Sequence, residues 1–304
     1  VYTYEELKKG DCTIEQFVSQ FTSDQLAVFA CGTGWGVEGD SNPIIGANSE
    51  SVPGAAGETT HTLEKVYQVP SVIMADGPGG VRVTQHFTAR NVETGKEQEV
   101  FHYCIAWPSG TVLAQSFDRS IAEAVGEGMR NDLAAMKIGI FLAPGINIQR
   151  NPLCGRNFEY YSEDPLVAGE MAAAMVKGIQ KDHKAVACIK HFAANNQETN
   201  RNANNSVVGQ RALREIYLEP FRLGVEKGDA MTIMTSYNKI NGVPTANSYD
   251  LCTHIAREEW GFKGLIMTDW NGGSSTPWKS MHAGNDLIMP GGESRVLNIK
   301  NGVG

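Results

Sequence analysis

The chain has 304 residues, of which 41% are hydrophobic and 20% charged, and this is the composition of a folded protein rather than a disordered one. The length is sufficient for one barrel-sized domain with a substantial core. The formal net charge is −8, and the lysines and arginines are scattered singly. Nucleic acid is not an expected partner, because no basic stripe could follow a phosphate backbone. A membrane is not an expected partner either, because no apolar run reaches about 18 residues.

The six cysteines are widely spaced and form no Cys-x-x-Cys pair. In a chain of this size we expect buried thiols of a reducing compartment, and neither a disulfide framework nor a zinc site. The seven histidines contain no His-x-His or His-Glu-x-x-His pattern, so we predict no metal and no cofactor. The N-terminus lacks the basic and apolar regions of a secretory signal, as would a processed mature protein. A cytoplasmic location is favoured on these grounds, and secretion stays compatible with the sequence.

The first 30 residues predict two or three short helices. Thr13 with Gln16, and Thr22 with Gln25, have the spacing of capping boxes ahead of apolar periodicity. Both pairs therefore mark places where a helix is expected to begin.

Residues 32–57 are rich in Gly, Ser, Asn and Pro, and predict a long irregular loop. A GxGxxG match occurs inside this stretch, at Gly34, Gly36 and Gly39. A dinucleotide-binding fingerprint requires a strand before it and a helix after it, whereas here a helix precedes and Asp-Ser-Asn-Pro follows. We interpret the stretch as a loop that covers a pocket.

From residue 70 onward, apolar runs alternate with helical patterns. The predicted strands cover residues 71–75, 111–115, 138–142, 185–190, 231–235, 265–268 and 286–289. The predicted helices begin near Ser120, run over 165–180 behind Asp164, run over 211–226 with a kink at Pro220, and run over 248–260.

This alternation indicates parallel βαβ units, and about seven of them predict a (β/α)8 TIM-type barrel with one irregular or missing strand. An open doubly wound sheet is the alternative, and it predicts functional residues at a single switch point. Polar clusters follow nearly every predicted strand, as the ring of loops around a barrel requires. We expect residues 1–304 to form a single barrel domain, without repeats or linkers.

The stretch 261–270, GFKGLIMTDW, has the strongest functional signal within this pattern. Its short apolar run predicts a strand that is buried on both faces. Asp269 and Trp270 follow at the end of the strand, where barrel enzymes keep their chemistry. The alternative interpretation is that Asp269 only caps the next helix.

Other polar residues follow the predicted strands and can meet at the same mouth. They are Asp76 and Arg82, Arg150 and Arg156, Lys190 and His191, and Tyr237. Carboxylates and cations bind pairs of hydroxyls through charge-assisted hydrogen bonds, and an indole ring packs on the apolar face of a sugar. The mixture therefore suits a neutral polyol substrate. Arg150, Arg82 and Glu159 are instead expected to tie loops together.

The segments MADGPGGVR, GINIQRNPLCGRNFEYYSEDP, IKHFAANNQETNR, ALREIYLEPF, TSYNKING and GFKGLIMTDW together resemble glycoside hydrolase family 3, and its β-glucosidases in particular. The similarity covers residues from about 70 to 291, with the motifs in the order of the family. It implies a retaining two-step hydrolysis that releases terminal β-D-glucose, with a β-glucoside or oligosaccharide as substrate. A β-xylosidase or a mixed glucosidase and xylosidase of the same family is the nearest alternative.

The resemblance also implies roles for individual residues. Asp269 matches the catalytic nucleophile, Tyr237 the tyrosine beside it, and Trp270 an aromatic wall of the −1 subsite. The residues that match ligands of the sugar hydroxyls are Asp76, Arg156, Lys190 and His191. Lys190, Arg156 and His191 are expected to favour the charged form of the Asp269 carboxylate. Members of the family have non-proline cis peptide bonds here, so we expect one at Lys190-His191 or Phe192-Ala193.

A retaining glycosidase also needs a second carboxyl group about 5–5.5 Å from the nucleophile, as its acid/base. The sequence lacks the His-Asp pair that the N-acetylhexosaminidase branch carries after its Lys-His-Phe motif, so that branch is rejected. In the glucosidase branch the acid comes from an α/β sandwich domain, which these residues do not contain. Glu198 and Glu163 are possible donors within the chain, but we do not favour either.

We therefore expect this chain to be one segment of a longer polypeptide, with the sandwich domain supplied by that polypeptide or by a second chain. A homo-oligomer is also compatible with the sequence. A sugar-binding barrel without catalytic activity is the competing hypothesis from another class. A mechanism-based fluoro-sugar would separate the two, since only the enzyme would be labelled at Asp269.

Overall fold

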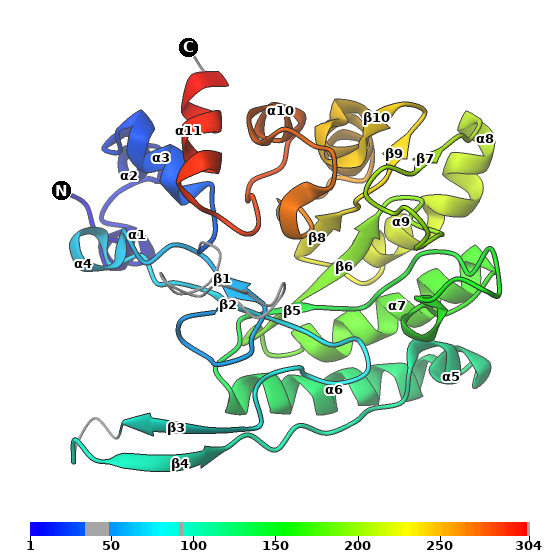
Figure 1. Cartoon of the computed structure of the whole chain (residues 1–304), viewed down its shortest axis with the longest axis horizontal. Helices are drawn as coiled ribbons and strands as arrows, with labels where there is room; N and C mark the ends of the chain where they lie inside the picture. The colour runs from blue at the N-terminus through cyan, green and yellow to red at the C-terminus, as the bar shows by residue number, and fades with distance from the viewer. Residues whose placement is uncertain (34–48, 91–93, 303–304) are drawn as a thin grey trace.

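The computed structural model describes residues 1–33, 49–90 and 94–302 (Figure 1). The glycine-rich match at residues 34–39 lies outside these described residues, so its interpretation as a pocket cover stays a prediction.

The chain begins with three short helices, as expected from the capping signals. They are α1 (Tyr4–Lys9), α2 (Ile14–Ser19) and α3 (Ser23–Phe29). In each case a threonine at the N-cap accepts a hydrogen bond from the third helical residue, whose side chain reaches back to the N-cap backbone. The capping boxes predicted at Thr13 and Thr22 are confirmed.

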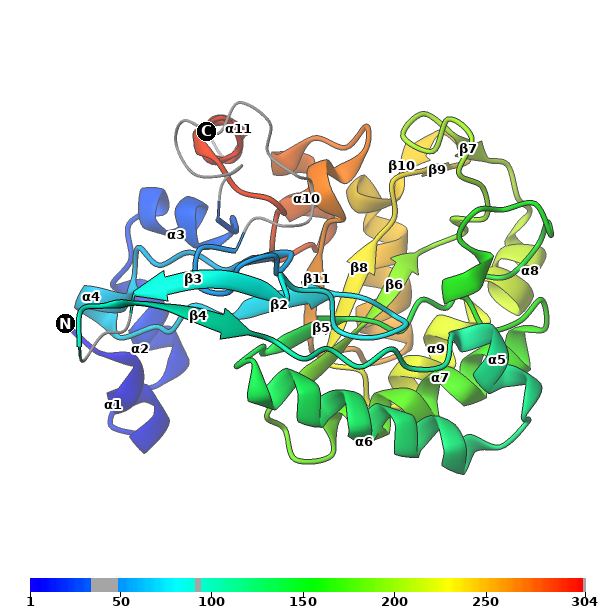
Figure 2. The same cartoon turned by 60° about the horizontal axis from the view of Figure 1, so that its bottom comes forward.

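A six-stranded sheet forms the centre of the molecule, in the order β1-β2-β5-β6-β8-β11 (Figures 1 and 2). Its strands are β1 (Gly57–Glu58), β2 (Ile73–Asp76), β5 (Ile140–Leu142), β6 (Val186–Phe192), β8 (Thr232–Thr235) and β11 (Leu265–Met267). Neighbouring strands are parallel from β2 to β11, whereas β1 is antiparallel to β2. Each parallel strand lies within two residues of a predicted one at both ends.

Beyond β11 the sheet continues only as isolated bridges. Met267 bridges Leu287 in parallel, and Ile288 bridges Cys31 in parallel. The predicted strand over 286–289 is therefore reduced to single bridged residues. The sheet curls in the manner of a TIM barrel without forming a regular eight-fold barrel.

The strand predicted over residues 111–115 is wrong, because these residues form helix α5 (Gly110–Gln115). Gly110, Leu113 and Ala114 are buried while Val112 is exposed, so burial follows the helical spacing of three and four rather than alternation. A short apolar run with β-branched residues is compatible with a strand and with a helix. Here the packing of one face against the core favours the helix.

Three helices cover one side of the sheet: α6 (Arg119–Ala135), α7 (Pro165–Gln180) and α9 (Glu219–Glu226) (Figures 1 and 2). Asp164 caps α7 and Pro165 occupies its first position, as predicted. Helix α6 begins slightly before the predicted Ser120, because Asp118 accepts from the backbone N–H of Ser120 and is the N-cap.

The predicted helix over 211–226 is broken, as the proline suggested. It consists of α8 (Gln210–Ala212), the π-helical turn η2 (Leu213–Tyr217) and α9, whose first turn contains Pro220. The segment predicted over 248–260 is the π-helix η4 (Asp250–Glu259), after which Gly261 adopts a φ of 69°.

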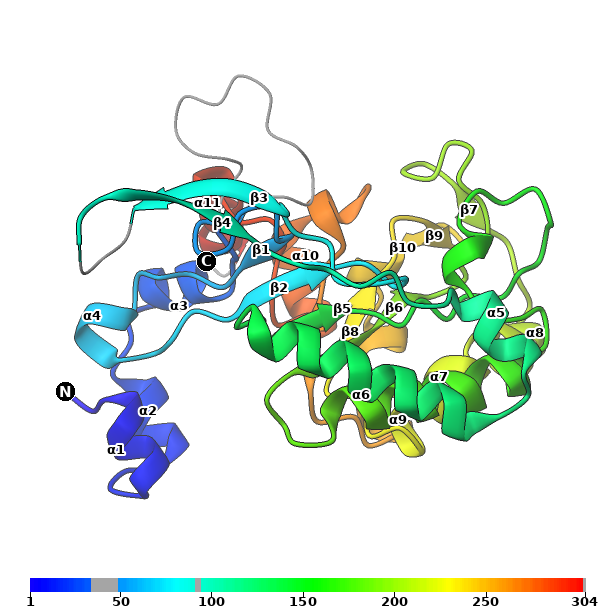
Figure 3. The ribbon, with the colours of Figure 1, turned by 90° about the horizontal axis from the view of Figure 1, so that it is seen from below.

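Several small elements are absent from the predicted pattern. The antiparallel hairpin of β3 (His86–Arg90) and β4 (Glu97–Phe101) extends to one side, away from the central sheet (Figures 1 and 3). The other short strands are β7 (Asn205–Ser206), β9 (Lys239–Ile240) and β10 (Val243–Pro244). The remaining helical segments are α4 (Glu64–Tyr67), η1 (Asn157–Glu159), η3 (Thr245–Asn247), η5 (Trp270–Gly272), α10 (Pro277–Ala283) and α11 (Glu293–Gly302).

The hydrophobic core has two main parts. A large cluster packs between the sheet and the helices, and includes Phe141 and Phe221. A smaller cluster lies inside the curl of the sheet, where Met74, Met234 and Met267 meet. The cysteines are unpaired thiols, of which Cys104 and Cys154 are only partly buried, contrary to the expectation for all six. No helix of the described residues has both the length and the apolar character to cross a membrane.

Candidate active site

The carboxyl ends of the parallel strands meet at one edge of the sheet, and the seven site residues predicted from the sequence line one cavity of about 290 Å³ there. They are Asp76, Arg156, Lys190, His191, Tyr237, Asp269 and Trp270. Asp76 ends β2, Lys190 and His191 lie in β6, and Asp269 follows β11. Residues far apart in the sequence are thus neighbours because the strands that precede them are neighbours.

Asp269 is buried at the base of this cavity. Its Oδ1 accepts the backbone N–H of Trp270 at 2.7 Å, whereas its Oδ2 has no hydrogen-bond partner among the described residues. Burial raises the pKa of Asp269, although Arg156, Lys190 and the neighbouring hydroxyl of Tyr237 act in the opposite direction. The expectation that neighbouring cations would favour the charged form is correct for Arg156 and Lys190, but the loss of hydration outweighs them.

His191 is also buried, and its ring is neutral. Burial, followed by the positive charges of Arg156, Lys190 and Arg201, holds the pKa of His191 well below its usual value. Its Nε2 lies 3.8 Å from Oδ2 of Asp269, which is too long for a hydrogen bond. This contact joins a neutral imidazole to a carboxylate and is not an ion pair.

The backbone around His191 is held from one side by Asn147. The side chain of Asn147 accepts from the His191 N–H at 2.8 Å and donates to the His191 carbonyl at 2.9 Å. The peptide bonds Lys190-His191 and Phe192-Ala193 are both cis, so the non-proline cis bonds implied by the family resemblance are present. The register between β6 and β8 shifts at this point, and the consecutive residues Lys190 and His191 both line the cavity.

Asp76 is fixed in its ionised form. Its carboxylate accepts from Nζ of Lys190 at 2.6 Å, from Arg82 at 3.0 Å and from the backbone N–H of Gly77 at 2.9 Å. Burial alone would raise the pKa of Asp76, but Lys190 and Arg82 lower it to about 2. Asp76 is therefore a permanent hydrogen-bond acceptor at neutral pH.

Of the three residues expected to tie loops together, Glu159 and Arg82 make ion pairs that do so, and Arg82 pairs with Asp76 at the cavity. Glu159 is 4% exposed, pairs closely with Arg156, and lies 4.0 Å from Nζ of Lys190. Arg82 lines the cavity with a largely exposed side chain. Arg150 lies outside this cavity and is exposed.

Tyr237 and Arg201 form the wall beside Asp269. The guanidinium of Arg201 lies over the Tyr237 ring, 4.6 Å from its centre, and also pairs with Glu198 at 3.2 Å. Burial and the charge of Asp269 raise the pKa of Tyr237 above its usual value. Arg201 is not among the site residues predicted from the sequence, although it is the last residue of the IKHFAANNQETNR motif.

Trp270 lines the cavity but is only 4% exposed. Its indole packs closely against β1. A Cβ on Gly57 would lie 2.9 Å from Cε of Met289 and 3.3 Å from Cζ2 of Trp270. A side chain at Gly57 would therefore crowd both Met289 and the indole.

Asp76 and Asp269 are the only carboxylates that line the cavity among the described residues. Glu163 is exposed and Glu198 is paired with Arg201, and neither lines the cavity. The pKa of Asp76 lies well below neutral pH, so its carboxyl group is ionised at neutral pH and has no proton to donate. The part of the chain that the structure describes also contains no group of three or more His, Cys, Asp or Glu side chains placed to bind a metal.

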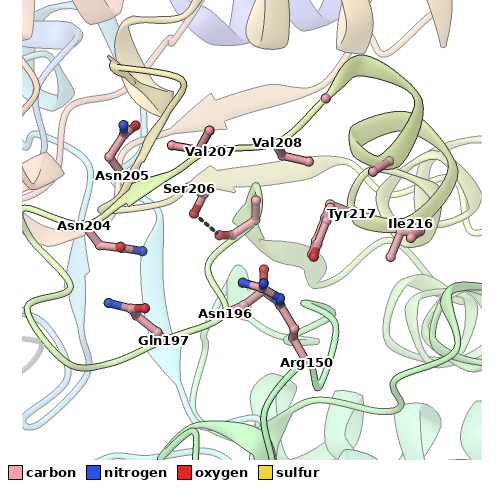
Figure 4. A pocket seen from close by; sticks show the side chains of 13 residues that line it. Arg150, Asn196, Gln197, Asn204, Asn205, Ser206, Val207, Val208, Ile216 and Tyr217 are labelled. Carbon is pink, nitrogen blue, oxygen red and sulfur yellow. Dashed lines mark hydrogen bonds between the residues drawn. The ribbon is translucent and has the colours of Figure 1, made fainter.

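A second hollow, of about 360 Å³, lies near the loop that follows β6 (Figure 4). The side chains of Asn196, Gln197 and Asn204 point into it, together with Arg150 and Tyr217 (Figure 4). It contains no carboxylate among the described residues and hence no nucleophile of the kind that Asp269 supplies. The cavity of about 290 Å³ that Asp269 lines is therefore the candidate active site.

The fold and the cavity define a barrel-type α/β domain with a charged site at the carboxyl edge of its sheet. Comparison with known proteins gives the family. The family model described as "Glycosyl hydrolase family 3 N terminal domain" matches residues 48–299. The chain belongs to glycosyl hydrolase family 3.

Its relatives are named as glycosidases. The chain is 37% identical over 292 residues to β-glucosidase A of Butyrivibrio fibrisolvens, a match that covers 96% of this chain and 31% of the relative. It is 42% identical over 222 residues to an exo-α-(1→6)-L-arabinopyranosidase of Bifidobacterium longum, covering 73% of this chain and 28% of that one. The chain spans about a third of the length of the curated relatives it matches.

The solved structures agree with this assignment. β-glucosidase 3B of Thermotoga neapolitana, in complex with glucose, superposes with a TM-score of 0.84 at 39% sequence identity. The match covers 95% of this chain and 39% of that structure. The resemblance to family 3 predicted from the motifs is confirmed.

Proposed function

We propose that this chain is the nucleophile-bearing barrel domain of a retaining exo-β-glycosidase, a β-glucosidase that releases terminal β-D-glucose. The observation that carries the proposal is the carboxylate of Asp269. Its Oδ2 is buried, lacks a hydrogen-bond partner among the described residues, and belongs to a side chain that lines a cavity with cations and an imidazole. A carboxylate on the wall of a cavity, with an oxygen that no hydrogen bond holds, can act as a nucleophile toward a substrate bound there.

In the first step, Oδ2 of Asp269 bonds to the anomeric carbon while the bond from that carbon to the glycosidic oxygen breaks. The departing oxygen takes a proton from a general acid, and a glycosyl ester remains on Asp269. In the second step, water attacks the same carbon, gives its proton to the conjugate base of that acid, and releases Asp269. Arg156 and Lys190 partly offset the cost of keeping Asp269 ionised for the attack.

The remaining cavity residues bind the sugar hydroxyls. Asp76, held between Lys190 and Arg82, presents a carboxylate to a pair of hydroxyls, which we assign to positions 4 and 6 of glucose. Arg156 and His191 are on the side of Asp269 and take hydroxyls nearer the anomeric carbon. Trp270 forms part of the wall of the site.

The general acid comes from outside the described residues, since Asp76 is ionised at neutral pH and Asp269 is the nucleophile. We assign it to an α/β sandwich domain of the same polypeptide or of a second chain. The relatives are about three times as long as the matched segment, which supports this assignment. Residues 1–304 would then be one catalytic barrel domain that is completed by a partner domain.

Two other functions are compatible with the site. A β-xylosidase, or a mixed glucosidase and xylosidase, would use the same nucleophile, and a relative named for an arabinopyranoside shows that the family includes pentosidases. A sugar-binding barrel without turnover would keep the hydroxyl ligands and lack the acid. Labelling of Asp269 by a 2-fluoro glycoside would exclude the second of these.

The nucleophile assignment is tested with Asp269→Ala in the complete protein. We expect turnover of an aryl glucoside to fall at least about 10⁴-fold, because the covalent intermediate cannot form. Sodium azide should restore part of the rate and give a glucosyl azide of inverted anomeric configuration, since the small anion fits the space left by the carboxylate. Glu163→Ala, which removes an exposed carboxylate outside the cavity, is the control and should keep its rate without responding to azide. Wild-type turnover by Asp269→Ala would refute the assignment.

A further inference from the structure

Three buried side chains form a contact chain behind the cavity wall. Oη of Tyr160 lies 3.2 Å from Nδ1 of His191, and Nδ2 of Asn195 donates to the same hydroxyl at 3.5 Å. Their exposed fractions are 0% for Tyr160, 1% for His191 and 2% for Asn195, so water does not compete for these contacts. Tyr160 and Asn195 do not line the cavity, and therefore act on a substrate only through His191.

The direction of these hydrogen bonds follows from which groups can donate. The side-chain amide of Asn195 can only donate through its nitrogen, so the Tyr160 oxygen accepts that bond and has its own proton left to give. Burial holds the pKa of Tyr160 well above its usual value, so the hydroxyl keeps this proton. Nδ1 of His191 is the acceptor within reach, and it must then carry the lone pair of the ring.

The surroundings of Nε2, on the opposite side of the ring, also favour a proton on Nε2. Nε2 faces Oδ2 of Asp269 at 3.8 Å, and this oxygen has no other partner among the described residues. An N–H at Nε2 is attracted by the carboxylate, whereas a lone pair would be repelled by it. The doubly protonated ring is disfavoured by burial and by the positive charges of Arg156, Lys190 and Arg201, while Asp269 is the one negative charge against the ring among the described residues.

We propose that Tyr160 is a positioning residue that holds His191 in its neutral form with the proton on Nε2. His191 then presents an N–H to the cavity beside the nucleophile. If the proposed glycosidase function holds, this N–H donates to a sugar hydroxyl next to the anomeric carbon. A neutral donor binds that hydroxyl and leaves the charge of Asp269 intact, whereas an imidazolium would neutralise it.

Neutron diffraction of deuterium-exchanged crystals of the complete protein tests the proton position without any need for turnover. We expect a deuteron on Nε2 of His191, none on Nδ1, and the Tyr160 deuteron directed at Nδ1. A deuteron on Nδ1, alone or together with Nε2, would overturn the proposal. Because this measurement involves no reaction, its outcome is separate from that of the Asp269→Ala test.

Kinetics of Tyr160→Phe test the consequence, with Tyr161→Phe as the matched control. Tyr161 is the next residue, is also buried, and its hydroxyl has no hydrogen bond to the described part of the chain. We expect Tyr160→Phe to lower kcat/KM about tenfold and to move the acidic limb of its pH profile to higher pH, because Nδ1 becomes free to take a proton. Tyr161→Phe should leave the position of that limb unchanged. A folded Tyr160→Phe protein with the wild-type kcat/KM and pH profile would refute the proposal.

Discussion

Asp269 occupies a position that suits reaction better than folding. One of its oxygens is buried without a partner among the described residues, and burial raises its pKa. A carboxylate with a raised pKa in the folded state binds protons more tightly than in the unfolded chain, so its ionisation costs folding free energy as the pH rises. The same lack of solvation leaves the oxygen free to attack.

We therefore expect Asp269→Asn to be more stable than the wild type at neutral pH while being inactive. The amide has nearly the same shape and carries no charge, so the cost of a buried, poorly solvated anion is removed. The midpoint of thermal unfolding should rise by a few degrees, which corresponds to about 1 kcal/mol. The difference should shrink toward acidic pH, where wild-type Asp269 is itself protonated. A lower midpoint at neutral pH would show that the carboxylate is a net stabilising group.

Asp76 has the opposite linkage to pH. Its folded pKa of about 2 lies below the ordinary value of 3.8, so its contribution to stability is fully present above the ordinary value and is lost as the pH falls toward 2. The two carboxylates of the cavity therefore differ because Asp76 has two cationic partners, whereas Asp269 has none in direct contact within the described part of the chain.

At the scale of elements, the helix layer behind the active site depends on two glycines, Gly126 of α6 and Gly178 of α7, which let these helices approach closely. A Cβ on Gly178 would lie 2.1 Å from the carbonyl oxygen of Glu123 and 2.9 Å from the Cα of Gly126. Both atoms belong to the backbone of α6 and cannot rotate away. At this crossing point the two helices therefore touch through their backbones.

We predict that Gly178→Ala lowers the free energy of unfolding by about 2 kcal/mol or more, because the helices must separate to admit the methyl group. Gly209→Ala is the matched control, since nothing lies within 4 Å of its Cβ position and its φ is −72°. That change should stay within about 0.5 kcal/mol, as the loss at a helix N-cap and the gain in chain stiffness nearly cancel. Urea unfolding followed by circular dichroism measures both. Equal effects of the two substitutions would contradict the close approach of α6 and α7.

At the scale of the whole molecule, the proposed mechanism places the nucleophile and the sugar-binding residues in this chain and the proton donor elsewhere. A leaving group that departs as a stable anion needs no proton, whereas an alcohol does. The two kinds of substrate therefore report separately on the barrel and on the proposed acid-bearing domain.

For the chain of 304 residues by itself, we expect labelling of Asp269 by dinitrophenyl 2-deoxy-2-fluoro-β-glucoside, measured by mass spectrometry of the peptide that contains it. Hydrolysis of cellobiose should be slower than in the complete protein by about 10²–10⁴-fold, the usual contribution of general acid catalysis. The complete protein, with Asp269→Asn as the unlabelled control, sets the scale. Equal rates on cellobiose would place the acid within the chain, and tight binding without labelling would favour the sugar-binding barrel.

Much of the site was predictable from local pattern. Asp76, Lys190 and Asp269 come at or just beyond the ends of strands that are strongly apolar in sequence, and parallel strands bring such ends to one edge. Arg201 had no such signal, because it lies in a long polar loop. Tyr160 and Asn195 had none either, since their importance comes from contact with the back of His191.

The fold shows the same division. Capping signals and the run from Asp164 to Gln180 specify their helices locally, because each depends on hydrogen bonds within a few residues. Residues 111–115 became a helix because one face packs against the core, and residues 286–289 pair only through isolated bridges. Both outcomes depend on neighbours that are distant in sequence.

The sequence by itself thus determined the family, the positions of the parallel strands along the chain and the identity of seven cavity residues. Only the tertiary structure decided how these residues are charged. Burial raises the pKa of Asp269 and lowers that of His191, and the direction of each shift depends on which charges lie within a few ångströms. The sequence specifies the residue types, whereas the loss of hydration and the distances between charges arise only when the chain folds.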